Sequence, residues 1–175
     1  MPELFLEREF DEPLCAADLY AAGRRGQGCF ELYRIEWLGS LLATDGHRMV
    51  CRFRAADAES VRIALRTVGA DVSCLWPGTL HDRPDLTEAE GASANVLVRR
   101  RFTAAVTLAE IQAREDAGAW CLEAHRVSFV RTIFSNDRRR MICLYRAPDA
   151  ESVRQAQRQA AMPVEDVWAF ESVLP

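Results

Sequence analysis

The chain has 175 residues, of which 49% are hydrophobic and 27% are charged, as in ordinary globular proteins. A formal charge of −4 and an isoelectric point near 5.5 exclude a broad basic surface for nucleic acid or anionic lipid. No apolar run approaches the roughly 18 residues of a membrane-spanning helix, and residues 1–8 lack a secretory signal pattern. We therefore expect a cytoplasmic protein with reduced cysteines and no membrane partner.

The two halves of the chain resemble one another when the sequence is shifted by 92 residues. Residues 4–76 then align without a gap with residues 96–168, and 24 of the 73 pairs are identical. Such self-similarity predicts a duplicated structural unit. We expect a first repeat in residues 1–80, a linker rich in Asp, Glu, Gly and Pro in residues 81–95, and a second repeat in residues 96–175.

The first copy begins with a short β-prone segment, residues 4–10, followed by a helical segment. Three glycines, Gly23, Gly26 and Gly28, are expected to bend or fray this helix.

A hairpin comes next in the first copy. Residues 35–43 and 48–55 flank a turn that contains Asp45 and Gly46, a pair favoured in tight hairpins. Asp57 is the predicted N-cap of a second helix, and a last strand is expected to begin near Val72.

The second copy predicts the same series of elements, with Asp149 as the N-cap and residues 136–139 as the hairpin turn. The order strand, helix, strand, strand, helix, strand is typical of the ferredoxin-like fold. The sequence therefore predicts an α+β protein in which two ferredoxin-like βαββαβ repeats pack as a pseudo-dimeric α/β barrel. This intramolecular pseudo-dimer leaves further homo-oligomers open, and the space between the two sheets is the expected cavity.

Two arginines, Arg8 and Arg100, share strand parity with apolar residues and should point to an apolar face. A buried guanidinium needs a partner, either an internal carboxylate such as Glu31 or Glu123, or a small anionic ligand between the sheets. Three tryptophans are expected either in the core or at the lining of this cavity: Trp37, Trp76 and Trp168.

Cys121 and His125 are the best candidate metal ligands, because residues four apart on a helix share a face and can hold a soft divalent ion. Glu123 and His47 are further candidates. A packed cysteine beside a surface histidine is the structural alternative. A nucleophile and base pair is another, although no third orienting residue is recognisable.

Several motif classes are missing from the sequence. There is no glycine-rich dinucleotide motif, no P-loop and no H-E-x-x-H motif, so no nucleotide cofactor is expected. The strand aromatics do not follow the pattern of RNA-recognition domains, so no nucleic-acid partner is expected.

Three runs in the second copy, residues 121–127, 135–154 and 163–168, resemble a bacterial domain-of-unknown-function family that is also described as nickel-binding. The first copy matches this pattern less closely, at residues 29–33 and 45–51. The resemblance implies a ferredoxin-like fold, assembly into a dimeric barrel and, for part of the family, nickel binding.

The first functional hypothesis is therefore a cytoplasmic protein that binds a transition metal, namely nickel. The alternative is a cofactor-free enzyme or small-molecule binder that uses the cavity between the two sheets, with Arg8 and Arg100 fixing an anionic substrate. A structural or regulatory interaction domain is a third reading, for which exposed strand edges would be the feature to look for.

Overall fold

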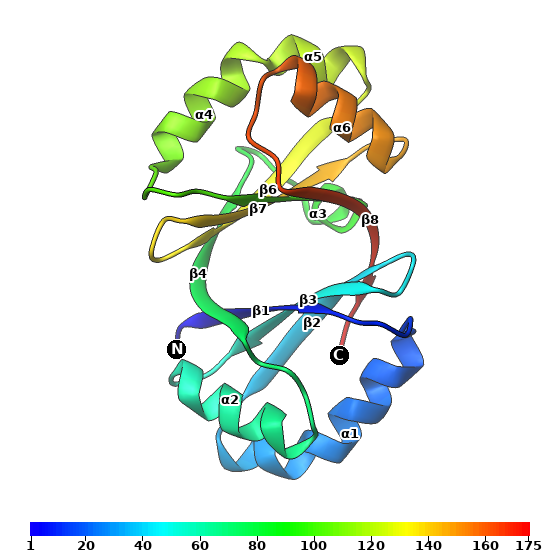
Figure 1. Cartoon of the computed structure of the whole chain (residues 1–175), viewed down its shortest axis with the longest axis vertical. Helices are drawn as coiled ribbons and strands as arrows, with labels where there is room; N and C mark the ends of the chain where they lie inside the picture. The colour runs from blue at the N-terminus through cyan, green and yellow to red at the C-terminus, as the bar shows by residue number, and fades with distance from the viewer. The chain divides into compact units, whose positions relative to one another are not determined.

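The computed structural model describes the whole chain, residues 1–175 (Figure 1). The chain divides into two compact units, the first made of residues 1–78 and 171–175 and the second of residues 79–170. None of the helices combines the length and the apolar character that crossing a membrane requires.

The first unit contains most of six elements: β1 (Glu3–Glu9), α1 (Ala16–Leu32), β2 (Glu36–Ala43), β3 (Arg48–Arg54), α2 (Ala58–Thr67) and β4 (Cys74–Asp82). The strand order is β4–β1–β3–β2, and β1 pairs antiparallel with both β3 and β4. Helices α1 and α2 lie on one face of this sheet (Figure 1). Residues 171–175 also belong here, where the Tyr20 hydroxyl donates to the carbonyl of Leu174 at 2.9 Å.

Strand β1 has two different faces because side chains alternate along a strand. Leu4 and Leu6 join the core beneath the helices, together with Leu19 of α1 and Val61 of α2. Phe5 points to the opposite face, where its ring centroid lies 5.1 Å from that of Trp76. Even-numbered residues of β1 are therefore directed toward α1 and α2.

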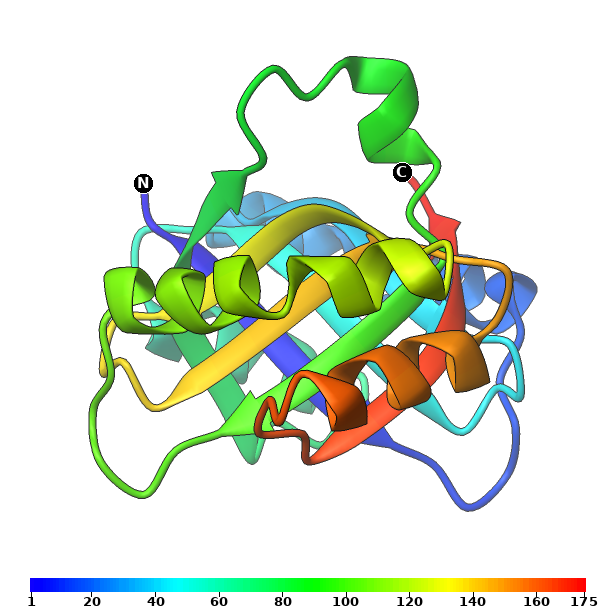
Figure 2. The same ribbon diagram turned by 90° about the horizontal axis from the view of Figure 1, so that it is seen from above.

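The second unit contains the rest: α3 (Glu88–Ala92), β5 (Val96–Arg101), α4 (Leu108–Ala117), α5 (Ala119–Ala124), β6 (Ser128–Ser135), β7 (Arg140–Arg146), α6 (Ala150–Gln159) and most of β8 (Asp166–Val173). Its strand order is β8–β5–β7–β6. Helices α4, α5 and α6 lie across its sheet, whereas the short helix α3 stands apart from them on the connection between β4 and β5 (Figure 2).

Both units show the predicted order βαββαβ, which confirms an α+β fold of two similar halves. The correspondence extends to an irregularity: the register of β2 against β3 shifts between Trp37 and Gly39, and that of β6 against β7 shifts between Phe129 and Arg131. These two bulges lie 92 residues apart, the same offset that aligns the sequences. The packing of the two repeats as a pseudo-dimeric barrel stays a prediction.

The first helix differs from expectation. Helix α1 runs unbroken through Gly23, Gly26 and Gly28, so the prediction of a frayed segment was wrong. The interruption lies in the second unit, where Gly118 separates α4 from α5. A Cβ at Gly118 would lie 2.6 Å from the Cβ of Ala160 at the end of α6, so the close approach of these two segments requires glycine at this point.

The predicted linker, residues 81–95, is more structured than its composition indicates. It contains the end of β4 and all of α3, which begins with a capping box in which Thr87 and Glu90 satisfy each other's backbone N–H groups. The compact units also differ from the predicted repeats at the C-terminus, because residues 171–175 associate with the first unit.

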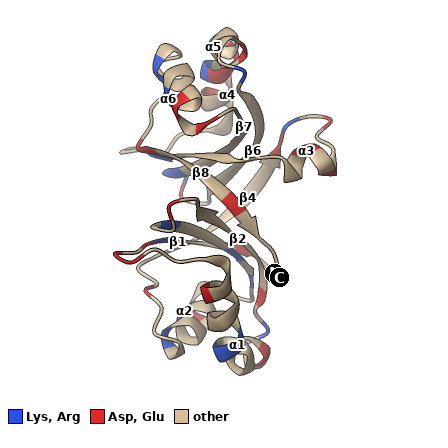
Figure 3. Cartoon of the chain, turned by 90° about the vertical axis from the view of Figure 1, so that its right-hand side faces the viewer, with Lys and Arg blue, Asp and Glu red and all other residues tan.

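The predicted caps and turn are present. Asp57 accepts a hydrogen bond from the backbone N–H of Ser60 at 2.8 Å, and Asp149 accepts one from Ser152 at 2.7 Å. In the first hairpin Gly46 has a φ of +77°, and Arg138 takes the equivalent left-handed position in the second with a φ of +61°. Acidic and basic positions are scattered along the ribbon of both units in the view of Figure 3.

Substitution of Gly46 by Ala should lower the free energy of unfolding more than the same change at Gly69. Both glycines have positive φ, +77° and +74°, so each alanine costs about 1–2 kcal/mol for a left-handed backbone. A Cβ at Gly46 would also lie 2.6 Å from the Leu14 carbonyl oxygen, whereas one at Gly69 meets nothing within 4 Å. Urea denaturation of Gly46→Ala and Gly69→Ala measures the difference, and equal losses would contradict this account of the hairpin.

The caps should make stability fall at acidic pH. Backbone hydrogen bonds from Ser60 and Ser152 lower the pKa of Asp57 and Asp149 from the usual 3.8. Because the folded-state pKa is depressed, this contribution is complete above the unfolded-state pKa and is lost as pH falls through the folded-state pKa. Asparagine caps a helix without titrating, so the melting temperature of Asp149→Asn should fall less steeply below about pH 4. Superimposable pH profiles would contradict this.

Candidate functional site

Arg8 is a cation without a carboxylate partner on the helix-covered face of the first unit. Its guanidinium carbon lies 4.6 Å from the ring centroid of Phe10, a cation–π distance. Arg8 is half-buried; its Nε is buried and donates to no acceptor, as is also true of the Arg100 Nε, and no carboxylate forms an ion pair with its guanidinium. A guanidinium carries five N–H donors, so Arg8 retains binding capacity that the chain does not use.

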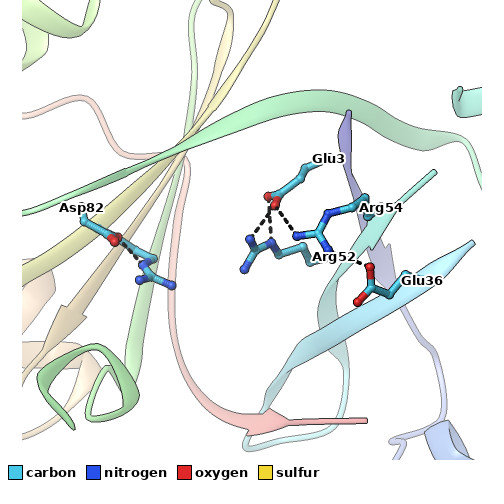
Figure 4. Close-up of polar contacts among 6 residues, drawn as sticks. Glu3, Glu36, Arg52, Arg54 and Asp82 are labelled. Carbon is cyan, nitrogen blue, oxygen red and sulfur yellow. Dashed lines mark hydrogen bonds and ion pairs between the residues drawn. The ribbon is translucent and has the colours of Figure 1, made fainter. Parts of the chain in front are cut away.

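Other arginines of the same sheet are paired. On the opposite face, Arg52 donates through Nε and Nη2 to the two carboxylate oxygens of Glu3, at 2.8 and 2.6 Å (Figure 4). Arg54 donates to Glu36 at 2.7 Å. In the second unit Asp82 likewise accepts from Arg131 at 2.7 Å. The unpaired state of Arg8 is therefore a local feature and not a general property of arginines in this chain.

Arg8 lines a cavity of about 370 Å³ that is built from the first unit alone. The walls come from the helix-facing side of β1, β2 and β3, from α1 and from the end of α2. Most lining side chains are apolar, among them Leu19, Phe30, Met49, Phe53 and Leu65. A mainly apolar cavity of a few hundred cubic ångströms with a few polar groups is the usual form of a small-molecule site.

The polar groups in the wall form a short chain of hydrogen bonds. Trp37 Nε1 donates to Ser40 Oγ at 3.1 Å, and the Ser40 hydroxyl donates to Cys51 Sγ at 2.9 Å. Burial raises the pKa of the Cys51 thiol to about 11, although the Ser40 hydrogen bond and the charge of Arg8 act in the opposite direction. Cys51 is thus a neutral thiol at physiological pH and is not activated as a nucleophile.

The charged residues that line the cavity are Arg8, Arg25 and Asp18. Arg25 is exposed on α1. Asp18 is engaged at the start of the same helix, where its carboxylate accepts the backbone N–H of Cys15 at 2.8 Å. Two arginines against one engaged carboxylate make the cavity locally positive within a chain of net negative charge.

In the second unit the equivalent arginine, Arg100, is fully buried and paired. Its Nη2 donates to Gln157 Oε1 at 2.8 Å and to the Tyr145 hydroxyl at 3.2 Å, and it lies 3.6 Å from Glu115 Oε1. Its Nη1 donates to the carbonyl of Pro163 at 2.6 Å. The prediction of Glu31 or Glu123 as the partner was therefore wrong for Arg100. Glu115 lies on the buried face of α4, one turn after Ile111, whereas Glu123 is exposed on α5.

The titration of this cluster follows from its burial. Burial raises the pKa of Tyr145 well above 10, so its hydroxyl stays protonated and donates to Glu115 Oε1 at 2.9 Å. Burial also raises the pKa of Glu115, while the hydrogen bond from Tyr145 and the positive charge of Arg100 oppose that rise. The second unit thus contains an internal ion pair with two neutral hydrogen-bonding neighbours, which together engage the Nη atoms of Arg100 but leave its Nε without an acceptor.

All three side-chain partners of Arg100 are missing beside Arg8. At the 92-residue offset Glu115 corresponds to Gly23, Tyr145 to Phe53 and Gln157 to Leu65. Each of these three replacements lines the cavity. Arg8 therefore lacks the carboxylate, the phenol hydroxyl and the amide that surround Arg100.

Of the three predicted ligand-binding tryptophans, one lines the cavity and two lie elsewhere. Trp37 joins Arg8 at the cavity, but Trp76 lies on the opposite face of the sheet, where its Nε1 donates to Glu7 at 2.7 Å. Trp168 packs edge-on against Phe170 at 6.5 Å. The Arg8 cavity is not the expected space between two sheets, because Arg8 shares parity with Leu4 and Leu6 and so points under the helices.

The side chains of the predicted metal ligands do not lie close to one another. Nowhere in the chain do three or more His, Cys, Asp or Glu side chains form a group that could hold a metal ion. Cys121 is fully buried in the second core, whereas His125 Nε2 lies 3.0 Å from Gln159 Oε1. Glu123 is exposed, and His47 belongs to the first unit, with Nδ1 2.9 Å from the Phe10 carbonyl. These residues do not fit a nickel centre.

Comparison with known proteins gives one family match. Residues 97–169 match the family described as "Nickel responsive protein SCO4226-like". The crystal structure of SCO4226 from Streptomyces coelicolor is 18% identical, with coverage of 42% of this chain and 91% of that one and a TM-score of 0.39. A search of curated proteins found no match.

Two further solved structures resemble nearly the whole chain. A putative chlorite dismutase, TA0507, is 10% identical over 98% of this chain and 93% of its own, with a TM-score of 0.54. Chlorite dismutase from Candidatus Nitrospira defluvii is 13% identical over 99% and 90%, with a TM-score of 0.47. At 10% identity, the likeness to TA0507 concerns the fold alone. The family resemblance expected from the sequence is confirmed for the second repeat: residues 97–169 match the SCO4226-like family of nickel responsive proteins.

Proposed function

We propose that this chain binds a small anionic organic molecule in the cavity of its first unit, with Arg8 as the anchor. One observation carries the proposal: the half-buried Arg8 has no carboxylate partner in the chain, whereas Arg100 at the equivalent position lies 3.6 Å from Glu115 and donates through both Nη atoms. Because an unpaired buried donor is costly, a partner from outside the chain would relieve that cost.

The surroundings of Arg8 favour binding over chemistry. A guanidinium can bind an anion through two parallel hydrogen bonds, and apolar walls strengthen that interaction by excluding water. Phe10 fixes the guanidinium plane from one side. The thiol at the wall, Cys51, is neutral and already accepts a hydrogen bond from Ser40, so the cavity offers no activated nucleophile.

A second candidate is nickel association through the second repeat, favoured by the match of residues 97–169 to a nickel responsive family. The separated positions of Cys121, Glu123, His125 and His47 do not support it within one chain. A cytoplasmic location and further homo-oligomers remain expectations from the sequence.

Replacement of Arg8 should weaken anion binding without unfolding the protein. The probe is 1-anilinonaphthalene-8-sulfonate, an amphipathic anion whose fluorescence rises in apolar surroundings. Arg8→Met removes the charge but keeps an apolar stem, and loss of charge-assisted hydrogen bonds should lower the affinity about 10–100-fold. Arg24→Met is the matched control, because Arg24 is exposed on α1 and does not line the cavity. Equal affinities of the wild-type and Arg8→Met proteins would overturn the proposal.

Calorimetric titration of the reduced protein with Ni²⁺ separates the two candidates. Since no three suitable donors gather, we expect no binding tighter than about millimolar, or ~4 kcal/mol. Micromolar binding that is abolished in His125→Ala and retained in the control His81→Ala would instead favour the nickel candidate.

A further inference from the structure

We infer that the ligand of the first unit is an amphipathic carboxylate whose carboxyl group takes the place that the Glu115 side chain occupies beside Arg100. This inference rests on the proposed anion-binding function and specifies its ligand. The second unit serves as the template, because it contains the same arginine with its acidic partner already supplied by the chain.

The template is valid because the two units correspond element by element. Strands β2 and β6, β3 and β7, and helices α2 and α6 each begin and end 92 residues apart, and the bulges coincide at the same offset. Helix α1 covers the residues that correspond to α4 and α5. Gly23 therefore marks the point on α1 from which the second unit projects its carboxylate on α4.

Space for a ligand carboxylate exists at this point. A Cβ added at Gly23 would meet no atom within 4 Å, whereas the corresponding Glu115 is buried against Arg100 and Tyr145. Gly23 lines the same cavity as Arg8. An external carboxylate can thus approach Arg8 from the direction that Glu115 takes toward Arg100.

The rest of the cavity determines the body of the ligand. Where the second unit has the hydroxyl of Tyr145 and the amide of Gln157, the first has Phe53 and Leu65. These walls offer contact to hydrocarbon and no hydrogen bonds. The expected ligand is therefore a carboxylate with an alkyl or aryl body, and a polyhydroxylated or multiply charged anion would leave polar groups unpaired.

The planar carboxylate also fits the available donors better than a tetrahedral dianion. Arg8 supplies one two-pronged guanidinium, and the other lining cation, Arg25, is exposed. The Ser40 hydroxyl is already donated to Cys51. A phosphate dianion would retain one charge without a partner in the cavity.

The test uses the full chain and three probes that share an eight-carbon body: octanoate, octyl phosphate and octylamine, each measured by displacement of the fluorescent anion. We expect octanoate to bind at least tenfold more tightly than octyl phosphate and octylamine not to compete. Octyl phosphate equal to or tighter than octanoate would overturn the inference, although the anion-binding function would stand.

Gly23→Glu recreates the internal carboxylate of the second unit. We expect it to abolish octanoate binding and to raise the melting temperature above that of Gly28→Glu. Gly28 lies on the same helix, its added Cβ also meets nothing within 4 Å, and it does not line the cavity, so both variants share the gain in helix propensity. Octanoate binding by Gly23→Glu that equals that of Gly28→Glu would overturn the inference.

A second variant keeps the test decisive if Gly23→Glu does not fold. Leu65→Gln reproduces Gln157, whose Oε1 accepts from Arg100 at 2.8 Å, and should lower octanoate affinity by at least tenfold by giving Arg8 an internal acceptor. Unchanged affinity in Leu65→Gln would count against the carboxylate position. Failure of Arg8→Met to weaken any anion is the separate outcome that overturns the proposed function itself.

Discussion

A guanidinium placed beneath two helices has to be hydrogen-bonded, and this requirement distinguishes the two halves of the chain. In the second unit the chain satisfies it with Glu115, Tyr145 and Gln157 around Arg100. In the first unit the same strand position carries Arg8 and the partners are absent. The same scaffold occurs twice, and a cavity lies beside Arg8 in the first copy where the side chains of the second copy surround Arg100.

The division between scaffold and cavity has a physical basis. The aspartate caps of α2 and α6 and the strand bulges are the same in both halves, because the backbone geometry at these positions tolerates few alternatives. A buried ion pair contributes little net stability, since desolvation offsets most of the attraction. In the first unit only the partners are absent and the cation remains, so the cost of the unpaired charge is limited because Arg8 is half-buried beside Gly23, Phe53 and Leu65. The family match covers the second half, so it bears on the scaffold more than on this cavity.

Metal binding and anion binding make different demands on the same fold. A nickel site needs several donor side chains that converge on one point, and Cys121 and His125 do not converge, because one side chain enters the core while the other reaches Gln159. An anion site needs one unpaired cation with room beside it, and Arg8 supplies both. The family description and the geometry therefore lead to separate candidates, which the titrations distinguish.

The sequence by itself determined the repeat, the βαββαβ order and the caps at Asp57 and Asp149, because these depend on periodicity and on contacts a few residues apart. It also placed Arg8 on an apolar face by strand parity. The partner of Arg100 and the Gly118 break were decided only by the tertiary structure, since each depends on which residue of another element lies opposite. The signal for the cavity was nevertheless present, as the replacement of a polar residue by an apolar one at three aligned positions, but only the fold shows that all three surround one arginine.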